Sequence, residues 1–441
     1  MHLFPQLRKI EQKYGDRLVV VGVHSPKFPA ERETANLREA VLRYRIEHPV
    51  VNDRDFKLWQ AFGGRAWPTL VFIDPQGRVI GKHEGELPFS EFDPLVDGML
   101  AEFQARGLLR PGQAPLPIEG PSEADHPLRF PGRALSAGGR LFVADSNHHR
   151  IVIARWDGGI EKTIGAGVPA LRDGPPHQAA FQQPQGLALD GETLYVADTE
   201  NHAIRSVNLA DGMVTTLAGT GEQAPFGSQV GGAGPMSLSS PWDLVKAGSR
   251  LYVAMAGSHQ ICSLDLESGR VEAFAGSGRE DLQDGSRDQA WFAQPSGLAL
   301  LDNTLYVADS EVSAVRAIDL ETGEVSTLVG EGLFVFGDED GDRRSARLQH
   351  PLGIAAHEGT LYVADSYNNK VKRLDPRIGR LSTWLGSGAS GMADGAAAAA
   401  AFREPGGVSA AAEGLIVADT NNHRIAIADW SSGEVRTLIG R

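Results

Sequence analysis

The chain has 441 residues, of which 41% are hydrophobic and 22% charged, and its formal net charge is −14. This composition is that of a globular protein long enough for two domains. The negative net charge argues against general nucleic-acid binding, which needs a basic surface. A negative net charge does not exclude a local basic face. No stretch reaches the roughly eighteen consecutive apolar residues of a membrane span, so we expect no membrane partner.

The sequence contains a single cysteine, Cys262, so no intrachain disulfide can form. It lies in the strand-like run "HQICSLDL", which predicts a small buried apolar residue rather than a reactive thiol. The N-terminus lacks the apolar core of a secretory signal. We therefore expect a cytoplasmic protein, unless a signal precedes Met1.

Residues 1–106 predict an α/β layer structure in which helices alternate with strands. The apolar spacing of "LFPQLRKIEQKYG" is typical of a core-facing helix, and "RLVVVGV" predicts a buried strand after it. The turn "DPQG" at 74–77 predicts a hairpin. The remaining expected elements are helices over 29–46, 55–64 and 88–107, a short strand over 48–53 and the hairpin over 67–85.

A Pro- and Gly-rich linker is predicted at 107–130, and repeats of short strands follow over 131–441. The line "TLYVADTENHAI" recurs six times, with a second frame "QPQGLAL" before each copy. A fixed period with four strands per unit predicts an all-β six-bladed propeller. The aligned positions are Asp145, Asp198, Met255, Asp309, Asp365 and Asp419.

One face of this propeller collects two sets of elaborated loops. If the strands of a blade are named a to d from the axis outward, the b–c turns and the d–a connections share that face. The turn aspartates are expected to bond their own backbone, and the recurring Phe181, Phe292, Leu348 and Phe402 to anchor the d–a loops. Loop residues over a rigid scaffold are also where ligands bind. The candidate binding residues on this face are His149, Arg150, His202, Trp242, Asp243, Met255, His259, Asn368, Asn422 and His423.

The sequence contains no complete catalytic constellation, and it indicates no cofactor. The acidic run 336–345 has the carboxylate spacing of a calcium loop, but its glycine falls at position four and Gln349 stands at position twelve. A solvated acidic loop is the favoured interpretation, and we predict no metal site.

The repeat "LYVADTENHAIRSVNL" resembles the NHL repeat, and "SSPWDLV", "LQHPLGI" and "ADTNNHRI" are similar, in order, to motifs of the family of NHL-repeat-containing protein two and its bacterial relatives. That family joins a thioredoxin-like domain to a six-bladed propeller. The resemblance implies that "AWPTLVFIDPQG" holds a cis proline, Pro68, and that Trp67 and Thr69 line a thioredoxin-like groove. It also implies a redox dithiol and a central strand upstream of "LFPQLRKIEQKYG", so we expect Met1 to be an internal residue of a longer protein or the first domain to be a remnant.

Three functions remain open. The leading hypothesis is a binding platform for a protein, peptide or small-molecule ligand on the propeller face. The alternative is a thiol-disulfide oxidoreductase of the thioredoxin-like family, if the natural protein extends upstream of Met1. The third is a metal-dependent propeller hydrolase or lyase, for which Asp243 is the single candidate ligand near the axis.

Overall fold

The computed structural model describes residues 3–110, 112, 126–225, 231–233 and 236–440. The chain separates into two compact units, Met1–Ala124 and Asp125–Arg441. Of the predicted linker, 111 and 113–125 lie outside the described residues, and 126–130 belong to the second unit. No helix among the described residues is long and apolar enough to cross a bilayer.

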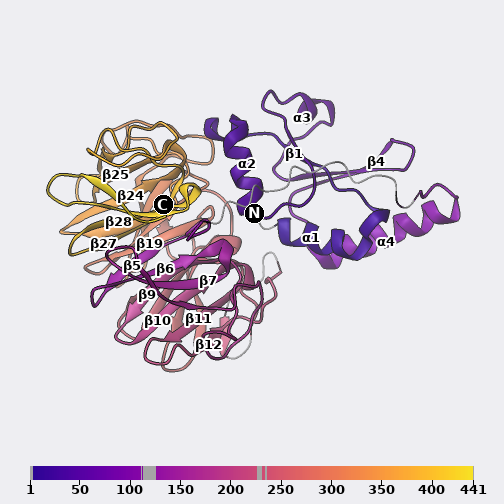
Figure 1. The fold of residues 1–441 in the computed structure, drawn as a ribbon. Helices are drawn as coiled ribbons and strands as arrows, with labels where there is room; N and C mark the ends of the chain where they lie inside the picture. Colours follow the sequence, from indigo (N-terminus) through magenta and orange to yellow (C-terminus); the bar gives the residue numbers. More distant parts are fainter. Residues whose placement is uncertain (1–2, 111, 113–125, 226–230, 234–235, 441) are drawn as a thin grey trace. The chain divides into compact units, whose positions relative to one another are not determined.

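The first unit packs helices against short strands. Leu7, Ile10 and Tyr14 of the first helix are buried against Phe92 and Val96 of the last helix, which lies beside it (Figure 1). The elements are α1 (Leu3–Tyr14), β1 (Gly22–His24), α2 (Thr34–Arg43), β2 (Val50–Asn52), α3 (Lys57–Ala61), β3 (Thr69–Ile73), β4 (Val79–Glu84) and α4 (Phe89–Ala105).

The strands of the first unit form two separate two-stranded sheets. β1 pairs in parallel with β2, and β3 pairs antiparallel with β4 through the predicted turn, in which Gly77 N–H donates to Asp74 O. The buried strand predicted over 17–23 is wrong: only Gly22–His24 is a strand, and Val21 and Val23 are 46% and 45% exposed. The reason is that among the described residues no strand pairs with the second edge of β1.

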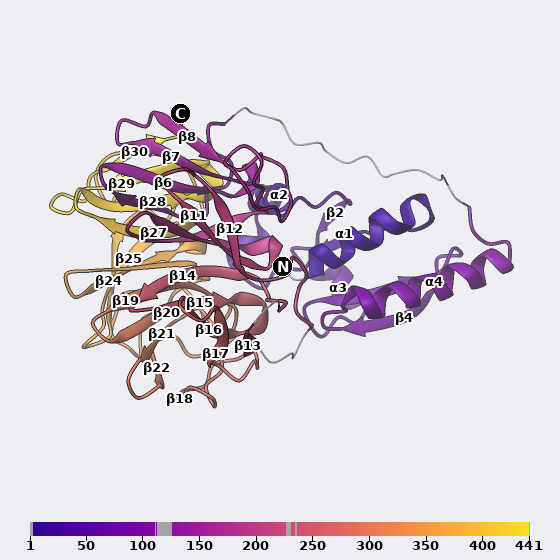
Figure 2. The same cartoon turned by 90° about the horizontal axis from the view of Figure 1, so that it is seen from below.

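The second unit is a six-bladed propeller of antiparallel four-stranded sheets (Figures 1 and 2). Blade one is β5 (Ala134–Ala137), β6 (Arg140–Asp145), β7 (Arg150–Arg155) and β8 (Ile160–Ile164); blade two is β9 (Pro184–Asp190), β10 (Thr193–Asp198), β11 (Ala203–Asn208) and β12 (Val214–Ala218). Blade three is β14 (Pro241–Ala247), β15 (Arg250–Met255), β16 (Gln260–Asp265) and β17 (Arg270–Ala275); blade four is β19 (Pro295–Leu301), β20 (Thr304–Asp309), β21 (Ala314–Asp319) and β22 (Glu324–Val329). Blade five is β23 (Gly353–His357), β24 (Thr360–Asp365), β25 (Lys370–Asp375) and β26 (Arg380–Leu385); blade six is β27 (Pro405–Ala411), β28 (Gly414–Asp419), β29 (Arg424–Ala428) and β30 (Val435–Ile439). Short strands β13 (Gly231–Ala233) and β18 (Gly285–Ser286) extend blades three and four at their outer edges.

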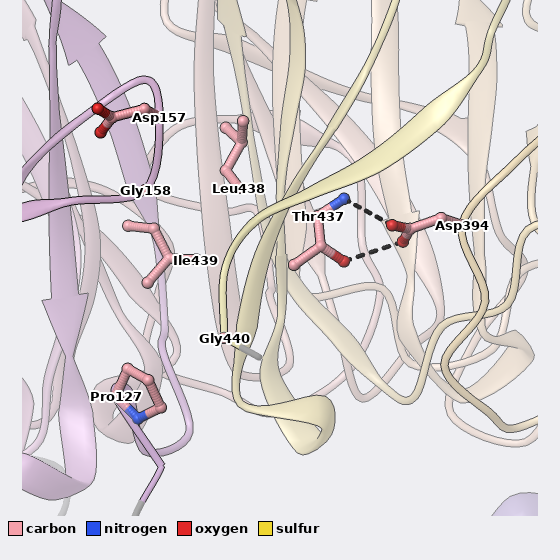
Figure 3. Close-up of a pocket in the computed structure, with 8 residues that line it drawn as sticks. All are labelled: Pro127, Asp157, Gly158, Asp394, Thr437, Leu438, Ile439 and Gly440. Carbon is pink, nitrogen blue, oxygen red and sulfur yellow. Dashed lines mark hydrogen bonds between the residues drawn. The ribbon is translucent and has the colours of Figure 1, made fainter.

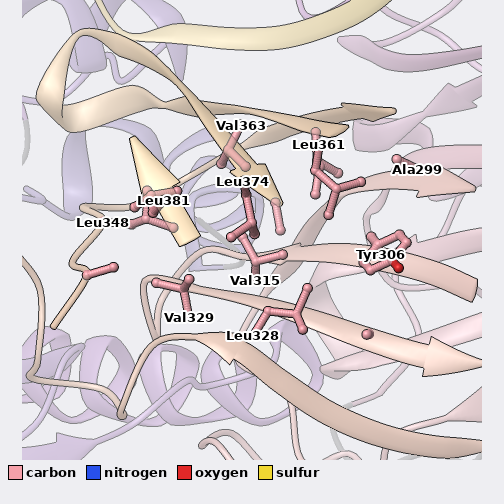
Figure 4. Packing of buried hydrophobic residues seen from close by; sticks show 14 residues of the cluster. Ala299, Tyr306, Val315, Leu328, Val329, Leu348, Leu361, Val363, Leu374 and Leu381 are labelled. Carbon is pink, nitrogen blue, oxygen red and sulfur yellow. The ribbon is translucent and has the colours of Figure 1, made fainter. Parts of the chain in front are cut away.

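Each pair of neighbouring blades encloses its own apolar core. Between blades four and five, Val315 and Leu328 face Leu361, Val363 and Leu374 (Figure 4). The strands are therefore buried on both faces, which explains why "LYVA" is apolar without alternation. The predicted loop anchors are confirmed: Phe181, Phe292, Leu348 and Phe402 are at most 1% exposed and lie in these cores.

The ring closes between blades six and one without a shared strand, because β5–β8 and β27–β30 are each continuous in sequence. Ile425 and Ile416 pack with Val143 and Val152 across this junction. Thr420 Oγ1 also donates to the carbonyl of Pro131 at 2.9 Å. Side-chain packing and hydrogen bonds therefore close the ring.

Candidate functional site

The b–c turns connect each blade to the next through one side chain. In five blades the turn is a 3₁₀ segment, and in all six a residue with φ of 47–55° follows it. The side chain of that residue accepts a hydrogen bond from a backbone N–H at the start of the next blade, at 3.0–3.2 Å. The acceptors are His149, His202, His259, Ser313, Asn369 and His423, and the donors are the backbone nitrogens of Gln183, Ser240, Gln294, His350, Glu404 and Phe130.

The predicted site histidines His149, His202, His259 and His423 all belong to this inter-blade contact. The first three are only 4–5% exposed. Because Nδ1 accepts, the ring must be neutral with its proton on Nε2. Burial lowers the pKa of His259 to about 4, against a weaker opposing effect of Glu311, and lowers that of His423 to about 4 as well.

The turn aspartates do not bond their own backbone as expected. Each is 0% exposed, and its Oδ1 accepts the backbone N–H sixteen residues upstream at 2.7–2.8 Å. Each Oδ2 faces a cation: Asp145–Arg150, Asp198–Arg205, Asp309–Arg316, Asp365–Lys372 and Asp419–Arg424. Burial raises the pKa of Asp198, Asp309 and Asp419 to about 6 and of Asp365 to about 7, while the paired cations act against this rise.

Blade three replaces this ion pair with two apolar side chains. Met255 stands at the aspartate position, and Cys262 stands seven residues later, where Arg205, Arg316 and Lys372 stand in blades two, four and five. Both are 0% exposed in the core between blades two and three. The predicted burial of the cysteine is confirmed, and burial raises the pKa of the Cys262 thiol to about 12.

The predicted Asn368 and Asn422 support the same turns. Each donates from Nδ2 to the turn aspartate at 2.8 Å and to a d–a loop carbonyl, that of Gly337 or Gly391.

The acidic run 336–345, predicted to be a solvated loop, forms ion pairs with the propeller. Asp338 and Asp340 pair with Lys372. Among the described residues, no three His, Cys, Asp or Glu side chains gather as a metal site requires.

The innermost strands meet so closely around the axis that four blades have glycine at one equivalent position. A Cβ on Gly353 would lie 2.8 Å from the carbonyl oxygen of Gly406, and one on Gly297 would lie 2.6 Å from that of Leu352.

We expect Gly353→Ala to lower the free energy of unfolding by about 2–3 kcal/mol, because the clash is with backbone. Chemical denaturation measures this loss of stability. The control is Gly391→Ala, because its Cβ would lie at an ordinary contact distance of 3.6 Å from Ala401 Cβ. Equal losses of unfolding free energy in the two variants would contradict the steric explanation.

At this axial position the other two blades have Arg133 and Asp243, which form an ion pair across blade two. Asp243 is 3% exposed, and its Oδ2 also accepts the N–H of Leu298 in blade four at 2.9 Å. Its Oδ1 has no hydrogen-bond partner in the described part of the chain, nor has Nε of Arg133. Burial raises the pKa of Asp243, against the attraction of Arg133.

Trp242 and Gln185 stand one residue before this axial position in blades three and two, and both are partly exposed. The structure therefore pairs the predicted Asp243 with Arg133, which the sequence analysis missed, and the predicted Trp242 precedes Asp243 in the same strand, as Gln185 precedes Gly186 in blade two. Arg133 could have been found by aligning the first repeat, because it stands where "PQG" has glycine. Met255 and the histidines lie outside this axial group.

The predicted groove residues of the first unit surround a cis peptide bond between Trp67 and Pro68, as the resemblance implied. The Trp67 ring is 46% exposed, stacks on Trp59 with centroids 4.3 Å apart, and donates from Nε1 to Ser25 O. Thr69 Oγ1 donates to Ala66 O at 2.6 Å. Two stacked indoles therefore flank the cis proline.

A cavity of about 300 Å³ opens at the seam between blades six and one (Figure 3). Its lining includes Pro127, Leu438 and Ile439 and two carboxylates, Asp157 and Asp394. Asp394 accepts hydrogen bonds from Thr437 and Arg424, and Asp157 accepts them from Arg155 and from the backbone N–H of Gly159. Both carboxylates therefore already have hydrogen-bond partners.

These features define a thioredoxin-like unit joined to an NHL-type six-bladed propeller. The family model of the thioredoxin-like domain matches residues 4–100, and that of the NHL repeat matches residues 181–205. The chain is homologous over nearly its whole length to NHL repeat-containing protein 2: the Bos taurus protein is 41% identical over 475 residues, covering 99% of this chain and 65% of the relative.

Two further relatives match very different shares of the chain. Protein SUPPRESSOR OF QUENCHING 1, chloroplastic, of Arabidopsis thaliana is 41% identical over 457 residues, covering 98% of this chain and 43% of that protein. Thiol-disulfide oxidoreductase YkuV of Bacillus subtilis is 28% identical over 98 residues, covering 22% of this chain and 66% of that protein. The chain thus spans less than two thirds of the length of the bovine relative and less than half of the plant relative.

Proposed function

We propose that the propeller is a binding platform, and that its ligand, a peptide or small polar molecule, docks on the loop-rich face at the axis. The observation that carries the proposal is the pairing of Arg133 with Asp243 where the other blades have glycine. Four blades show that the ring closes without side chains there. A buried ion pair is a weak source of stability, so its presence supports a role in recognition.

Trp242 supplies the contact area of the proposed site. It is partly exposed and adjacent in sequence to Asp243, and large aromatic side chains dominate binding energy at interfaces. Arg133, Asp243 and Gln185 would orient the polar groups of the ligand. His149, His202, His259, Asn368 and Asn422 would act indirectly, by holding the turns in place.

The test is selection of peptides from a random library against the whole chain. We expect Trp242→Ala to weaken binding of a selected peptide at least tenfold, about 1.4 kcal/mol. The matched control is Ile378→Ala, an apolar c–d turn residue that is 66% exposed on the opposite face. Selected peptides whose affinity is unchanged by Trp242→Ala would sink the proposal.

Thiol-disulfide exchange is the second candidate, favoured by the stacked Trp59 and Trp67 beside the cis proline and by the similarity to YkuV. The 441 residues hold one cysteine, so they contain no dithiol. Reduction of insulin by the natural protein, purified from its own cells, tests this candidate. Activity abolished by a thiol-alkylating reagent would support it, and its absence would remove it.

A further inference from the structure

Aromatic side chains gather between blades five and six, at the end of the propeller that carries the a–b and c–d turns. We call His357, Tyr362, Arg373 and Trp384 of blade five and Trp430 of blade six the aromatic cluster. The rings of His357 and Trp430 stack with centroids 4.1 Å apart, and those of Trp384 and Trp430 are parallel within 4° at 5.7 Å. Trp430 is fixed by a 2.8 Å hydrogen bond from Nε1 to Ala411 O.

The guanidinium of Arg373 lies over this aromatic surface. Its Cζ is 4.2 Å from the ring centroid of Trp384 and 5.9 Å from that of Tyr362. Stacking on an indole face holds the guanidinium plane, while its N–H groups remain in that plane to meet a planar acceptor. Arg373, His357, Trp384 and Trp430 are all partly exposed, so a ligand can reach the cluster.

The repeats show that the fold does not require a charge at this position. Arg373 is directly opposite Tyr362 in the sheet, and the residue in the same register of every other blade is uncharged. Those residues are Ile153, Ser206, Ser263, Ala317 and Ile427. At this register position, therefore, only blade five has a cation.

Arg373 also lacks the carboxylates that accompany the buried cations elsewhere. Arg205, Arg316, Lys372 and Arg424 each contact at least two aspartates. For Arg373 no ion pair occurs within the described residues, and its buried Nε has no hydrogen-bond partner there. The charged residues around the cluster include Glu358, whose side chain is 86% exposed, and the c–d turn pair Arg377–Asp375 at 3.5 Å. They also include Asp429, which precedes Trp430 and accepts hydrogen bonds from the hydroxyls of Ser431 and Ser432.

We propose that the aromatic cluster is a second binding site, on the face opposite the axial site, for a carboxylate of an acidic peptide segment. Arg373 donates two N–H groups to the carboxylate, Trp384 and Tyr362 hold the guanidinium, and Trp430 contacts the aliphatic part of the acidic side chain. A carboxylate fits because it is planar and bidentate, as is the edge of the guanidinium.

An NMR titration at low ionic strength tests the proposal. The probe is an N-acetylated, C-amidated Asp-Glu-Asp tripeptide, and the readout is the indole N–H signals of Trp384 and Trp430. We expect saturable shifts in the wild-type chain and none with the Asn-Gln-Asn peptide. Arg373→Gln should weaken binding at least tenfold, with partial rescue by Arg373→Lys. The matched control Arg377→Gln removes the same charge from a side chain that is 84% exposed on the same face and should bind as the wild type.

Three outcomes would overturn the proposal. They are the absence of saturable shifts in the wild-type chain, equal effects of Arg373→Gln and Arg377→Gln, and binding of inorganic phosphate without binding of the acidic peptide. Unchanged indole signals of Trp242 in each variant show that the propeller is folded, so loss of binding cannot be ascribed to unfolding.

Discussion

Replacing Asp309 by methionine is expected to lower the free energy of unfolding of the propeller by about 3–5 kcal/mol, the usual cost of breaking a buried ion pair from one side. Arg316 is 0% exposed and would keep Asp284, whose side chain is 49% exposed, as its remaining carboxylate partner, beside the carbonyls of Trp291 and Gln283. The N–H of Ala293 would lose its acceptor as well. Denaturation by guanidinium at pH 7 measures the loss.

The double variant Asp309→Met/Arg316→Cys is the matched control, because it copies Met255 and Cys262 of blade three. Removing both charges leaves no uncompensated ion in the core, so the double variant should be more stable than Asp309→Met alone. If the unfolding free energy lost by the double variant equalled the sum of the losses of the two single variants, the two positions would be independent. That result would contradict the view that Met255 and Cys262 of blade three are an apolar replacement for the ion pair.

Acid is expected to weaken the propeller through the inter-blade histidines, and His259→Asn should reduce this effect. The pKa of His259 is about 4 in the folded protein and about 6.5 when unfolded. Between these values the unfolded chain binds more protons, so stability is full above pH 6.5 and is lost as the pH falls towards 4. The loss from this residue is at most about 3 kcal/mol.

Asparagine is the matched substitution because Asn369 occupies the same position in blade five and accepts the N–H of Glu404 at 3.0 Å. The buried aspartates, whose pKa values are raised, have the opposite pH dependence, but they are common to both proteins and cancel in the comparison. Unfolding free energies at several pH values from 7 to 4 provide the measurement. Parallel curves for the wild type and His259→Asn would contradict the assignment.

The propeller could be predicted from the sequence because its period, its apolar strands and its turn residues all repeat. The role of the aspartates could not, because their partners are set by three-dimensional packing. Arg205 and Arg424 stand seven and five residues after their aspartates, so no fixed spacing reveals the ion pair. Similarly, Arg133 and Asp243 are 110 residues apart and meet only because the ring closes.

The first unit shows where pattern reasoning fails. "RLVVVGV" has the composition of a buried strand, but Val19, Val21 and Val23 are 45–56% exposed, since burial depends on a neighbouring strand rather than on the segment itself. The hairpin of β3 and β4 was predictable because its turn is local. The candidate site followed the same rule: Trp242 and Asp243 were visible as departures from the repeat, whereas their partners depended on ring geometry.

The measurement that tests the binding-platform account most directly is hydrogen exchange of the whole chain with and without a selected peptide. The account predicts protection of backbone amides around Trp242, Gln185 and Leu298, with no change over residues 4–100. Protection confined to residues around Trp67 in the thioredoxin-like unit would contradict it and would place recognition in the groove of the first unit.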